Sequence, residues 1–272
     1  MTSGTDVPIT IHANTLLLVK SVIIMLIQRL SWAGIKIESD GQLLLIDPVE
    51  TFQGRGVSVG PANPYLFSGS IKADTILLTH LHSDHYDSEV IKKTLRVRGQ
   101  VFSSDQIVDE LLSDGLETTG IALDESQQIG PFTITPVFAM DGIGDKQVSW
   151  VVEDREHRIL HGGDTMWHTQ LWSIAKKFGH FDAVFLPINA PVLNFPELSF
   201  GPVPLTMTPL QALAATRILN ADVLVPIHYG FHQPGVYEQY PDMLSELNEQ
   251  SKKQDVPFKL IEEGEYLTIP KN

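Results

Sequence analysis

The chain has 272 residues, a formal net charge of -14 at pH 7 and no cysteine. Its length allows a full hydrophobic core, in one large domain or in two small ones. The acidic balance, without a cluster of Lys and Arg side chains, argues against a nucleic-acid-binding surface. The absence of cysteine excludes disulfides and thiolate ligands, so a metal ion would be bound by nitrogen and oxygen atoms. A reducing cytoplasm is the simpler expectation for such a chain.

The most apolar segment lies near the N-terminus, from Leu16 to Ile27, and is interrupted by Lys20. It is shorter than the ~20 residues of a membrane span and carries a charge, so we expect no membrane span. A signal peptide would need small residues at a cleavage site, and the sequence after this segment offers a poor one. We therefore expect residues 1–24 to be a leader or an extra strand, followed by a single domain over residues 25–272.

Short apolar runs bounded by Gly, Pro, Asp or Asn recur along the rest of the chain and predict strands. Amphipathic segments between them predict helices, and in the clearest one Thr208 can cap the helix while Pro209 suits its first turn. Hairpins come first and alternating strands and helices follow, which is typical of an α/β protein with two packed sheets and helices outside. The predicted strands cover 34–39, 42–47, 73–80, 132–138, 148–154, 158–164 and 182–189, and the predicted helices cover 84–96, 104–113, 166–178, 207–220 and 237–252.

The segment from Thr75 to Asp87, "TILLTHLHSDHYD", places three histidines and two aspartates directly after an apolar strand. Alternation on an extended strand end directs His80 and His82 to the same side. Asp84 and His85 begin the next turn, from which they can reach the same point. A chance occurrence of this H-x-H-x-D-H pattern is on the order of one in a thousand. The pattern therefore favours a metal site over a polar turn with solvated histidines.

Four motifs, in the expected order, resemble those of the metallo-β-lactamase superfamily. "THLHSDHYD" resembles its H-x-H-x-D-H signature, and "LLLIDP", with Asp47, resembles its first motif. "ILHGGDT", with Asp164, resembles its Gly-Asp motif, and "VLVPIHYG", with His228, resembles its last ligand motif. The nearest branch contains ascorbate-6-phosphate lactonase and N-acyl-phosphatidylethanolamine phospholipase D. The resemblance, which runs from Met25 to Pro270, implies a four-layer αββα sandwich with ligands on loops along one edge of the two sheets.

The resemblance also implies a binuclear site for two divalent ions, zinc or manganese, with iron as a further option. Such ions lower the pKa of a bound water from 15.7 to about 7 and so produce a nucleophile at neutral pH. Asp84 could also orient this hydroxide. Asp47 either orients a ligand histidine or is a turn residue before Pro48. By this resemblance the first ion is bound by His80 and His82, the second by Asp84, His85 and His228, and Asp164 bridges the two.

A third histidine for the first ion is missing. In the family it comes from the segment after the strand that here ends in "TPVF", and this chain has Asp141 at that place. A carboxylate would make the metal a weaker Lewis acid and shift its preference from zinc toward manganese or iron. The alternative is that Asp141 only stabilises the turn from Gly142 to Gly144, and that the first site is weak or empty. We predict that Asp141 is a ligand.

Three further histidines lie near these motifs in the sequence. His168, four residues after Asp164, could contact substrate or donate a proton to a leaving group, and it is the predicted catalytic partner of Asp84. His161 alternates along its strand, and we expect it behind the ligands. His232 is a comparable candidate for substrate contact. An ordinary structural role is the alternative for each of the three.

The predicted function is that of a metal-dependent hydrolase that uses the metal-held hydroxide on a small-molecule ester, lactone, amide or phosphodiester. The segment from Pro187 to Met207 is expected to fold over the metals, with Phe195 and Phe200 as an apolar wall, but it contains no Arg or Lys for a phosphate. The alternative is a metal-binding protein of the same fold with a redox role, as in diiron relatives, or with no catalytic role. A homo-oligomer is left open.

Overall fold

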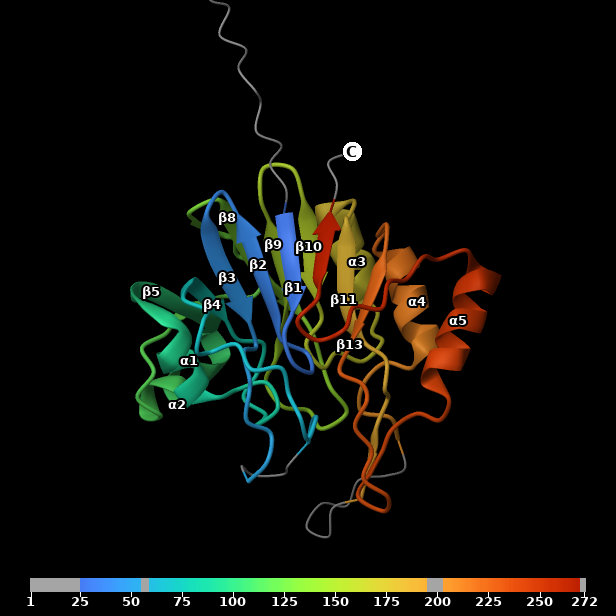
Figure 1. The fold of residues 1–272 in the computed structure, drawn as a ribbon. Helices are drawn as coiled ribbons and strands as arrows, with labels where there is room; N and C mark the ends of the chain where they lie inside the picture. Colours follow the sequence, from blue (N-terminus) through green and yellow to red (C-terminus); the bar gives the residue numbers. More distant parts are fainter. Residues whose placement is uncertain (1–24, 55–58, 195–202, 270–272) are drawn as a thin grey trace, which may run out of the picture.

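The computed structural model describes residues 25–54, 59–194 and 203–269. Two β-sheets face each other at the centre of the molecule, and helices cover the outer side of each sheet (Figure 1). This arrangement confirms the αββα sandwich expected from the sequence. The expectations for residues 1–24 and for Phe195 and Phe200 lie outside the described residues.

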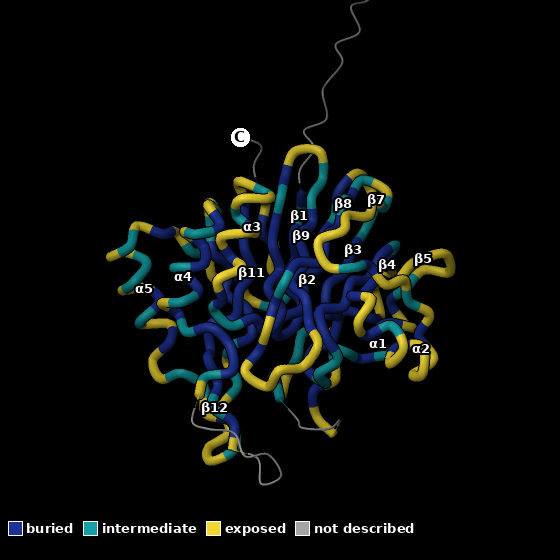
Figure 2. Tube along the Cα trace, turned by 180° about the vertical axis from the view of Figure 1, so that it is seen from behind, coloured by how far each residue is buried: buried dark blue, intermediate teal, exposed yellow. Residues whose placement is uncertain are grey.

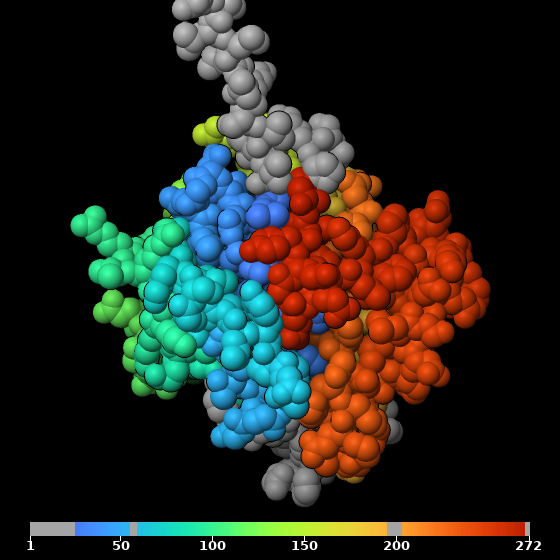
Figure 3. All heavy atoms as spheres, viewed as in Figure 1, coloured from blue at the N-terminus to red at the C-terminus, as the bar shows by residue number. Residues whose placement is uncertain are grey.

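The first sheet has seven strands in the order β15 (Tyr266–Ile269), β1 (Met25–Arg29), β2 (Ile35–Ser39), β3 (Gln42–Ile46), β4 (Ala73–Leu77), β5 (Leu95–Ser104) and β6 (Thr119–Ile121). Strands β15, β1, β2 and β3 are antiparallel neighbours, so the last strand of the chain lies beside the first, and red C-terminal residues contact blue N-terminal ones in Figure 3. Strands β3 to β6 are parallel neighbours. The carboxyl ends of β3 and β4 therefore share one edge of the sheet.

The second sheet has six strands in the order β13 (Leu224–Ile227), β11 (Ala183–Pro187), β10 (Arg158–His161), β9 (Val148–Glu153), β8 (Phe132–Phe138) and β7 (Gln127–Ile129). Strands β7 to β10 are antiparallel neighbours, whereas β10, β11 and β13 are parallel. The carboxyl ends of these last three strands again share an edge. A small third sheet pairs β12 (Val192–Leu193) with β14 (Tyr237–Glu238).

The outer layers are helical, with α1 (Ser88–Thr94), the 3-10 helix η1 (Asp105–Ile107) and α2 (Val108–Ser113) on the first sheet, and α3 (Gln170–Phe178), α4 (Pro209–Ile218) and α5 (Met243–Gln254) on the second. Successive side chains of β4 point to opposite faces of the sheet and pack into two different hydrophobic cores. Ile76 packs with Ile91 of α1, whereas Leu77 belongs to the cluster between the sheets, together with Trp150.

Figure 2 shows the buried residues concentrated in the sheets and the exposed ones in loops and outer helices. Across the described ranges, none of the helices is long and apolar enough to span a membrane.

The seven predicted strands are all present, and the predicted helices are shorter than expected. The helix expected at 84–96 begins only at Ser88, because the Asp87 side chain caps it by accepting the N–H of Val90. It ends at Thr94, and the chain passes directly into β5, a strand that the sequence analysis missed. The helix expected at 237–252 begins only at Met243. The capping role of Thr208 is confirmed, since its side chain accepts the N–H of Gln211.

Candidate metal centre

The predicted ligands meet at one edge of the two sheets, on loops that follow the carboxyl ends of parallel strands. Asp47 follows β3, and the segment from His80 to His85 follows β4. Asp164 follows β10, and His228 follows β13. Because parallel strands end at the same edge of a sheet, these residues are brought together although they are far apart in the sequence.

One group of ligand atoms comes from Asp84, His85, Asp164 and His228, which are all buried. Oδ1 of Asp164 lies 2.8 Å from Nε2 of His85 and 3.1 Å from Nε2 of His228. Oδ2 of Asp84 lies 3.3 Å from Nε2 of His228 and 3.9 Å from Nε2 of His85. The two imidazole nitrogens and two carboxylate oxygens therefore converge. They are the residues that the resemblance assigns to the second ion and to the bridge.

A second group, formed by His80, His82 and Asp164, lies next to the first. Nε2 of His80 is 3.0 Å from Nδ1 of His82 and 3.7 Å from Oδ2 of Asp164. The two oxygens of Asp164 thus face different groups, which is the arrangement that a bridging carboxylate needs. The structure brings the predicted ligands together in these two groups, with the exception of Asp141.

The chemistry of these side chains fits a bound cation. Nε2 of His85 and Oδ1 of Asp164 are buried, and within the described ranges neither has a hydrogen bond of acceptable geometry, although the atoms are close. Buried polar atoms without a well-formed hydrogen bond are unfavourable. A divalent cation between the side chains would satisfy both atoms, because both are good metal ligands.

The charges of these residues depend strongly on one another. Burial opposes the protonation of His85, but the carboxylate of Asp164 and its neighbours raise the pKa of His85 well above the ordinary value. Burial likewise opposes ionisation of Asp164, but His228 and His85 lower the pKa of Asp164 well below its usual range. In the metal-free chain a proton on His85 is therefore favoured and balances part of the carboxylate charge. A divalent cation would displace this proton, so binding should release it.

Asp47 lies behind the ligands and contacts the segment that carries them. It accepts the backbone N–H of Thr79 at 2.8 Å and the Thr79 hydroxyl at 2.6 Å. Its Oδ2 is also 2.8 Å from Nδ1 of His85, which leaves Nε2 of that ring for the metal centre. Such a carboxylate orients a ligand histidine and sets its tautomer. Of the two roles considered for Asp47, this contact supports the first.

Asn189 has the same relation to His228, and the sequence analysis missed it. Its Oδ1 is 2.9 Å from Nδ1 of His228, and its amide group donates to the hydroxyl of Tyr237 at 2.7 Å. Asn189 follows β11 just as Asp47 follows β3. Asn189 could therefore have been recognised in the sequence as a polar residue at the end of a predicted strand.

Asp141 lies in a different group, together with His82 and Asp145. Its Oδ1 accepts the N–H of Ile143 at 3.0 Å and that of Gly144 at 2.6 Å, so the turn-stabilising role is present. Its Oδ2 is buried without a hydrogen-bond partner in the described part of the chain, 3.9 Å from Nε2 of His82. Burial raises the pKa of Asp141. Ligation through Oδ2 stays a prediction.

Asp145, which the sequence analysis did not consider, contacts His82 on the side away from His80. Its Oδ2 lies 2.8 Å from Nε2 of His82, whereas Nδ1 of His82 faces His80. The two nitrogens of this ring thus have different partners. Asp145 can hold the proton of His82 on Nε2 and leave Nδ1 free to bind a metal.

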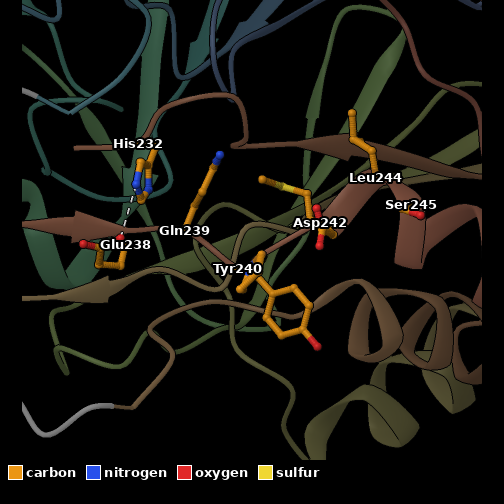
Figure 4. Close-up of a pocket in the computed structure, with 9 residues that line it drawn as sticks. His232, Glu238, Gln239, Tyr240, Asp242, Leu244 and Ser245 are labelled. Atoms are coloured by element: carbon orange, nitrogen blue, oxygen red, sulfur yellow. Dashed lines mark ion pairs between the residues drawn. The ribbon is translucent and has the colours of Figure 1, made fainter. Parts of the chain in front are cut away.

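Two of the other histidines have structural contacts. Nε2 of His161 is 2.8 Å from the carbonyl oxygen of Ala33, and the expected position of His161 behind the ligands stays a prediction. His232 pairs with Glu238 at 3.3 Å and lines a surface pocket of about 550 Å³ (Figure 4). None of the residues lining this pocket belongs to the ligand groups. Substrate contact by His232 stays a prediction.

His168 is buried beside Phe138, and both of its ring nitrogens lack a hydrogen-bond partner among the described residues. Burial lowers the pKa of His168 to about 4, so the ring is neutral at pH 7. A neutral ring cannot supply the imidazolium proton of a general acid. The predicted proton donation would therefore require a change in its surroundings, whereas contact with substrate through a ring nitrogen needs none.

The buried ring of His168 should make stability depend on pH. The folded chain keeps His168 neutral down to about pH 4, whereas the ordinary pKa is 6.5. Between these values the unfolded chain binds more protons, so the free energy of unfolding falls as pH is lowered from about 6.5 to 4. In wild type the free energy of unfolding should differ between pH 7.5 and pH 5, and His168→Gln should reduce this difference by about 2 kcal/mol. Urea unfolding at both pH values measures it.

The matched control is His180→Gln, because His180 is 43% exposed and pairs with Asp222 on the surface. This variant should keep the wild-type difference between the two pH values. If His168→Gln also keeps it, the neutral buried state of His168 is wrong.

The family profile described as "Beta-lactamase superfamily domain" matches residues 43–229, a range that includes Asp47, the segment from His80 to His85, Asp164 and His228. A UPF0173 metal-dependent hydrolase from Geobacillus thermodenitrificans is 30% identical over 219 residues, which cover 76% of this chain and 87% of that protein. The chain therefore belongs to the metallo-β-lactamase superfamily and, within it, to the UPF0173 metal-dependent hydrolase family.

Solved structures show the same fold at lower sequence identity. Igni18, a metallo hydrolase from the archaeon Ignicoccus hospitalis, has a TM-score of 0.69 at 21% identity, and the match covers 92% of this chain and 100% of that one. CmlA, a diiron β-hydroxylase from Streptomyces venezuelae, has a TM-score of 0.70 at 16% identity, and covers 92% of this chain but 55% of its own. These likenesses establish the metallo-β-lactamase fold.

Proposed function

We propose that this metal-dependent hydrolase binds two divalent ions, which share Asp164. The observation that carries the proposal is the position of Asp164, whose two carboxylate oxygens face two separate groups of ligands. His80 and His82 would complete the first site. Asp84, His85 and His228 would complete the second.

The ions would supply a water of lowered pKa, about 7 in place of 15.7, and a positive charge for the oxygen of the bond under attack. The residues of the chain prepare the site for this. Asp47 holds His85, Asn189 holds His228 and Asp145 holds His82, each by a hydrogen bond to the ring nitrogen that does not face the centre. Asp84 is the carboxylate that would orient the attacking water.

Zinc and manganese are the expected ions, with iron as a further option. The second site offers two imidazoles and two carboxylates, a set that suits zinc as well as manganese. Oxygen from Asp141 at the first site would move its preference toward manganese or iron. The redox alternative has one point in its favour, the fold shared with a diiron hydroxylase, but identity as low as 16% supports the fold alone.

The substrate class we propose is a small molecule with a carboxyl ester, lactone, amide or phosphodiester bond. The acidic chain, with 33 Asp and Glu against 19 Lys and Arg, disfavours nucleic acid. The resemblance to the lactonase and phospholipase branch stays a proposal, because the relatives found carry only the general description of metal-dependent hydrolases. A cytoplasmic location also stays a proposal.

Chelation should abolish hydrolysis, and added manganese or zinc should restore it, because the nucleophile depends on the ions. The experiment is a screen of generic lactone, ester, amide and phosphodiester substrates before chelation, after chelation and after each metal is returned. Activity that survives thorough chelation would contradict the mechanism. A visible absorption band in the purified protein, with no hydrolysis of any substrate, would favour the diiron alternative.

A further inference from the structure

Trp32 occupies the turn between β1 and β2 and is buried, with 1% of its surface exposed. Its backbone is left-handed, with φ of 61°, which is rare for a large aromatic residue and costs on the order of 1–3 kcal/mol. The turn is held by Glu263, whose Oε1 accepts the N–H of Trp32 at 3.1 Å and whose Oε2 accepts the hydroxyl of Ser31 at 3.2 Å. A strained conformation that is so firmly held calls for a reason.

The reason lies in the two residues that Trp32 contacts. Its indole Nε1 donates a hydrogen bond to Oδ2 of Asp84 at 3.0 Å. Its ring lies over the imidazole of His228, with 4.4 Å between the ring centroids, and its carbonyl oxygen accepts the N–H of His228 at 3.3 Å. One side chain therefore fixes both a carboxylate and an imidazole of the second group. The backbone of His228 is also left-handed, with φ of 56°.

We infer that Trp32 is a positioning residue for the second metal site. The inference rests on the proposed function, because it assumes that Asp84 and His228 bind the second ion. The indole N–H bonds Oδ2 of Asp84, the same oxygen that faces the rings of His228 and His85, so it fixes the rotation of the carboxylate with Oδ2 toward the second group. The indole ring prevents the imidazole of His228 from tilting away from Asp164. Outer residues of this kind are typically worth about 10- to 100-fold in metal affinity.

Trp32→Phe tests this inference, because phenylalanine keeps an aromatic ring but loses the N–H group. The matched control is Trp150→Phe. Trp150 is also fully buried, and its indole donates to the carbonyl oxygen of Leu78 at 3.0 Å, which is a backbone atom and not a proposed ligand. Both variants lose one buried indole hydrogen bond. Only the first loses a bond to a ligand.

The readout is the affinity for zinc and for manganese, titrated into the metal-free full chain in competition with a chromophoric chelator. We expect Trp32→Phe to weaken binding at the second site about 10- to 100-fold, seen as one weakened equivalent with the other unchanged, and Trp150→Phe to bind both equivalents as wild type does. Glu263→Gln, which weakens the anchor of the turn, should weaken the same equivalent to a smaller extent and serves as the second variant if Trp32→Phe does not fold.

Wild-type affinity for the second ion in the folded Trp32→Phe variant, or in Glu263→Gln where that is the variant that folds, would overturn the inference. Equal weakening in Trp150→Phe would also overturn it, because the effect would then be one of general stability. If the proposed function itself is wrong, the titration gives a different result. The wild-type protein would then bind fewer than two ions, and the positioning role of Trp32 would be wrong as well.

Discussion

Asp164→Ala should remove both metal ions from the chain rather than one. The two oxygens of Asp164 face the two ligand groups, so truncation removes a ligand from each site and leaves His80, His85 and His228 without their shared anion. Hydrolysis should fall by more than about 100-fold, which is more than the loss of an outer hydrogen bond typically causes. Metal content after dialysis and the rate with the best substrate from the screen measure the two effects.

Asp154→Ala is the matched control for Asp164→Ala. The side chain of Asp154 is also almost fully buried and accepts the hydroxyl of Ser39 at 2.7 Å, but it lies outside the ligand groups. This variant should lose stability and keep two ions. If Asp164→Ala retains one ion at full occupancy, Asp164 does not bridge.

Asp141→Asn should lower the bound metal from about two ions toward one without disturbing the turn. Asparagine keeps the carbonyl oxygen that accepts the N–H groups of Ile143 and Gly144, but it replaces the buried, unpaired Oδ2 by a neutral amide. Asp141→Ala should lose the ion and the turn bonds together. Asp141→His should keep two ions and move the preference toward zinc, because nitrogen replaces oxygen.

The measurement for this series is metal content after dialysis against equal zinc and manganese, with thermal unfolding beside it. Asp145→Asn is a useful companion, since Asp145 contacts the same histidine from the surface and should affect metal affinity less than the ligand itself does. Wild-type stoichiometry and selectivity in Asp141→Asn would show that Asp141 acts only through the turn.

Seven of the strands could be predicted from the sequence because each is a short apolar run between turn residues. Other strands were missed, and β5 is the longest of them, because Arg96 and Arg98 alternate with Val97 in its exposed first half and follow a helix without a break. Strand β1 was not among the predicted strands, and its partner β15 lies at the other end of the chain. The pairing of two strands from opposite ends of the chain produces no recognisable pattern in the sequence of either strand.

The side chains that converge at the candidate site could be predicted because an H-x-H-x-D-H pattern is rare and because Asp164 and His228 also follow strands. The residues behind them were harder to find. Trp32 lies in a hairpin turn among apolar residues, and only the folded chain brings its indole to Asp84. Asp145 lies in a polar segment that looks like any surface loop in the sequence. Its contact with His82 depends on how the loop after β8 folds back.

Anomalous X-ray diffraction from crystals of the purified wild-type chain, combined with metal analysis of the same sample, can show whether two ions share Asp164. We expect about two divalent ions per chain, one between His80 and His82 and one among Asp84, His85 and His228, with a different oxygen of Asp164 on each. Two anomalous peaks at these positions would support the claim. A single ion that leaves either group empty, or ions bound away from Asp164, would contradict it.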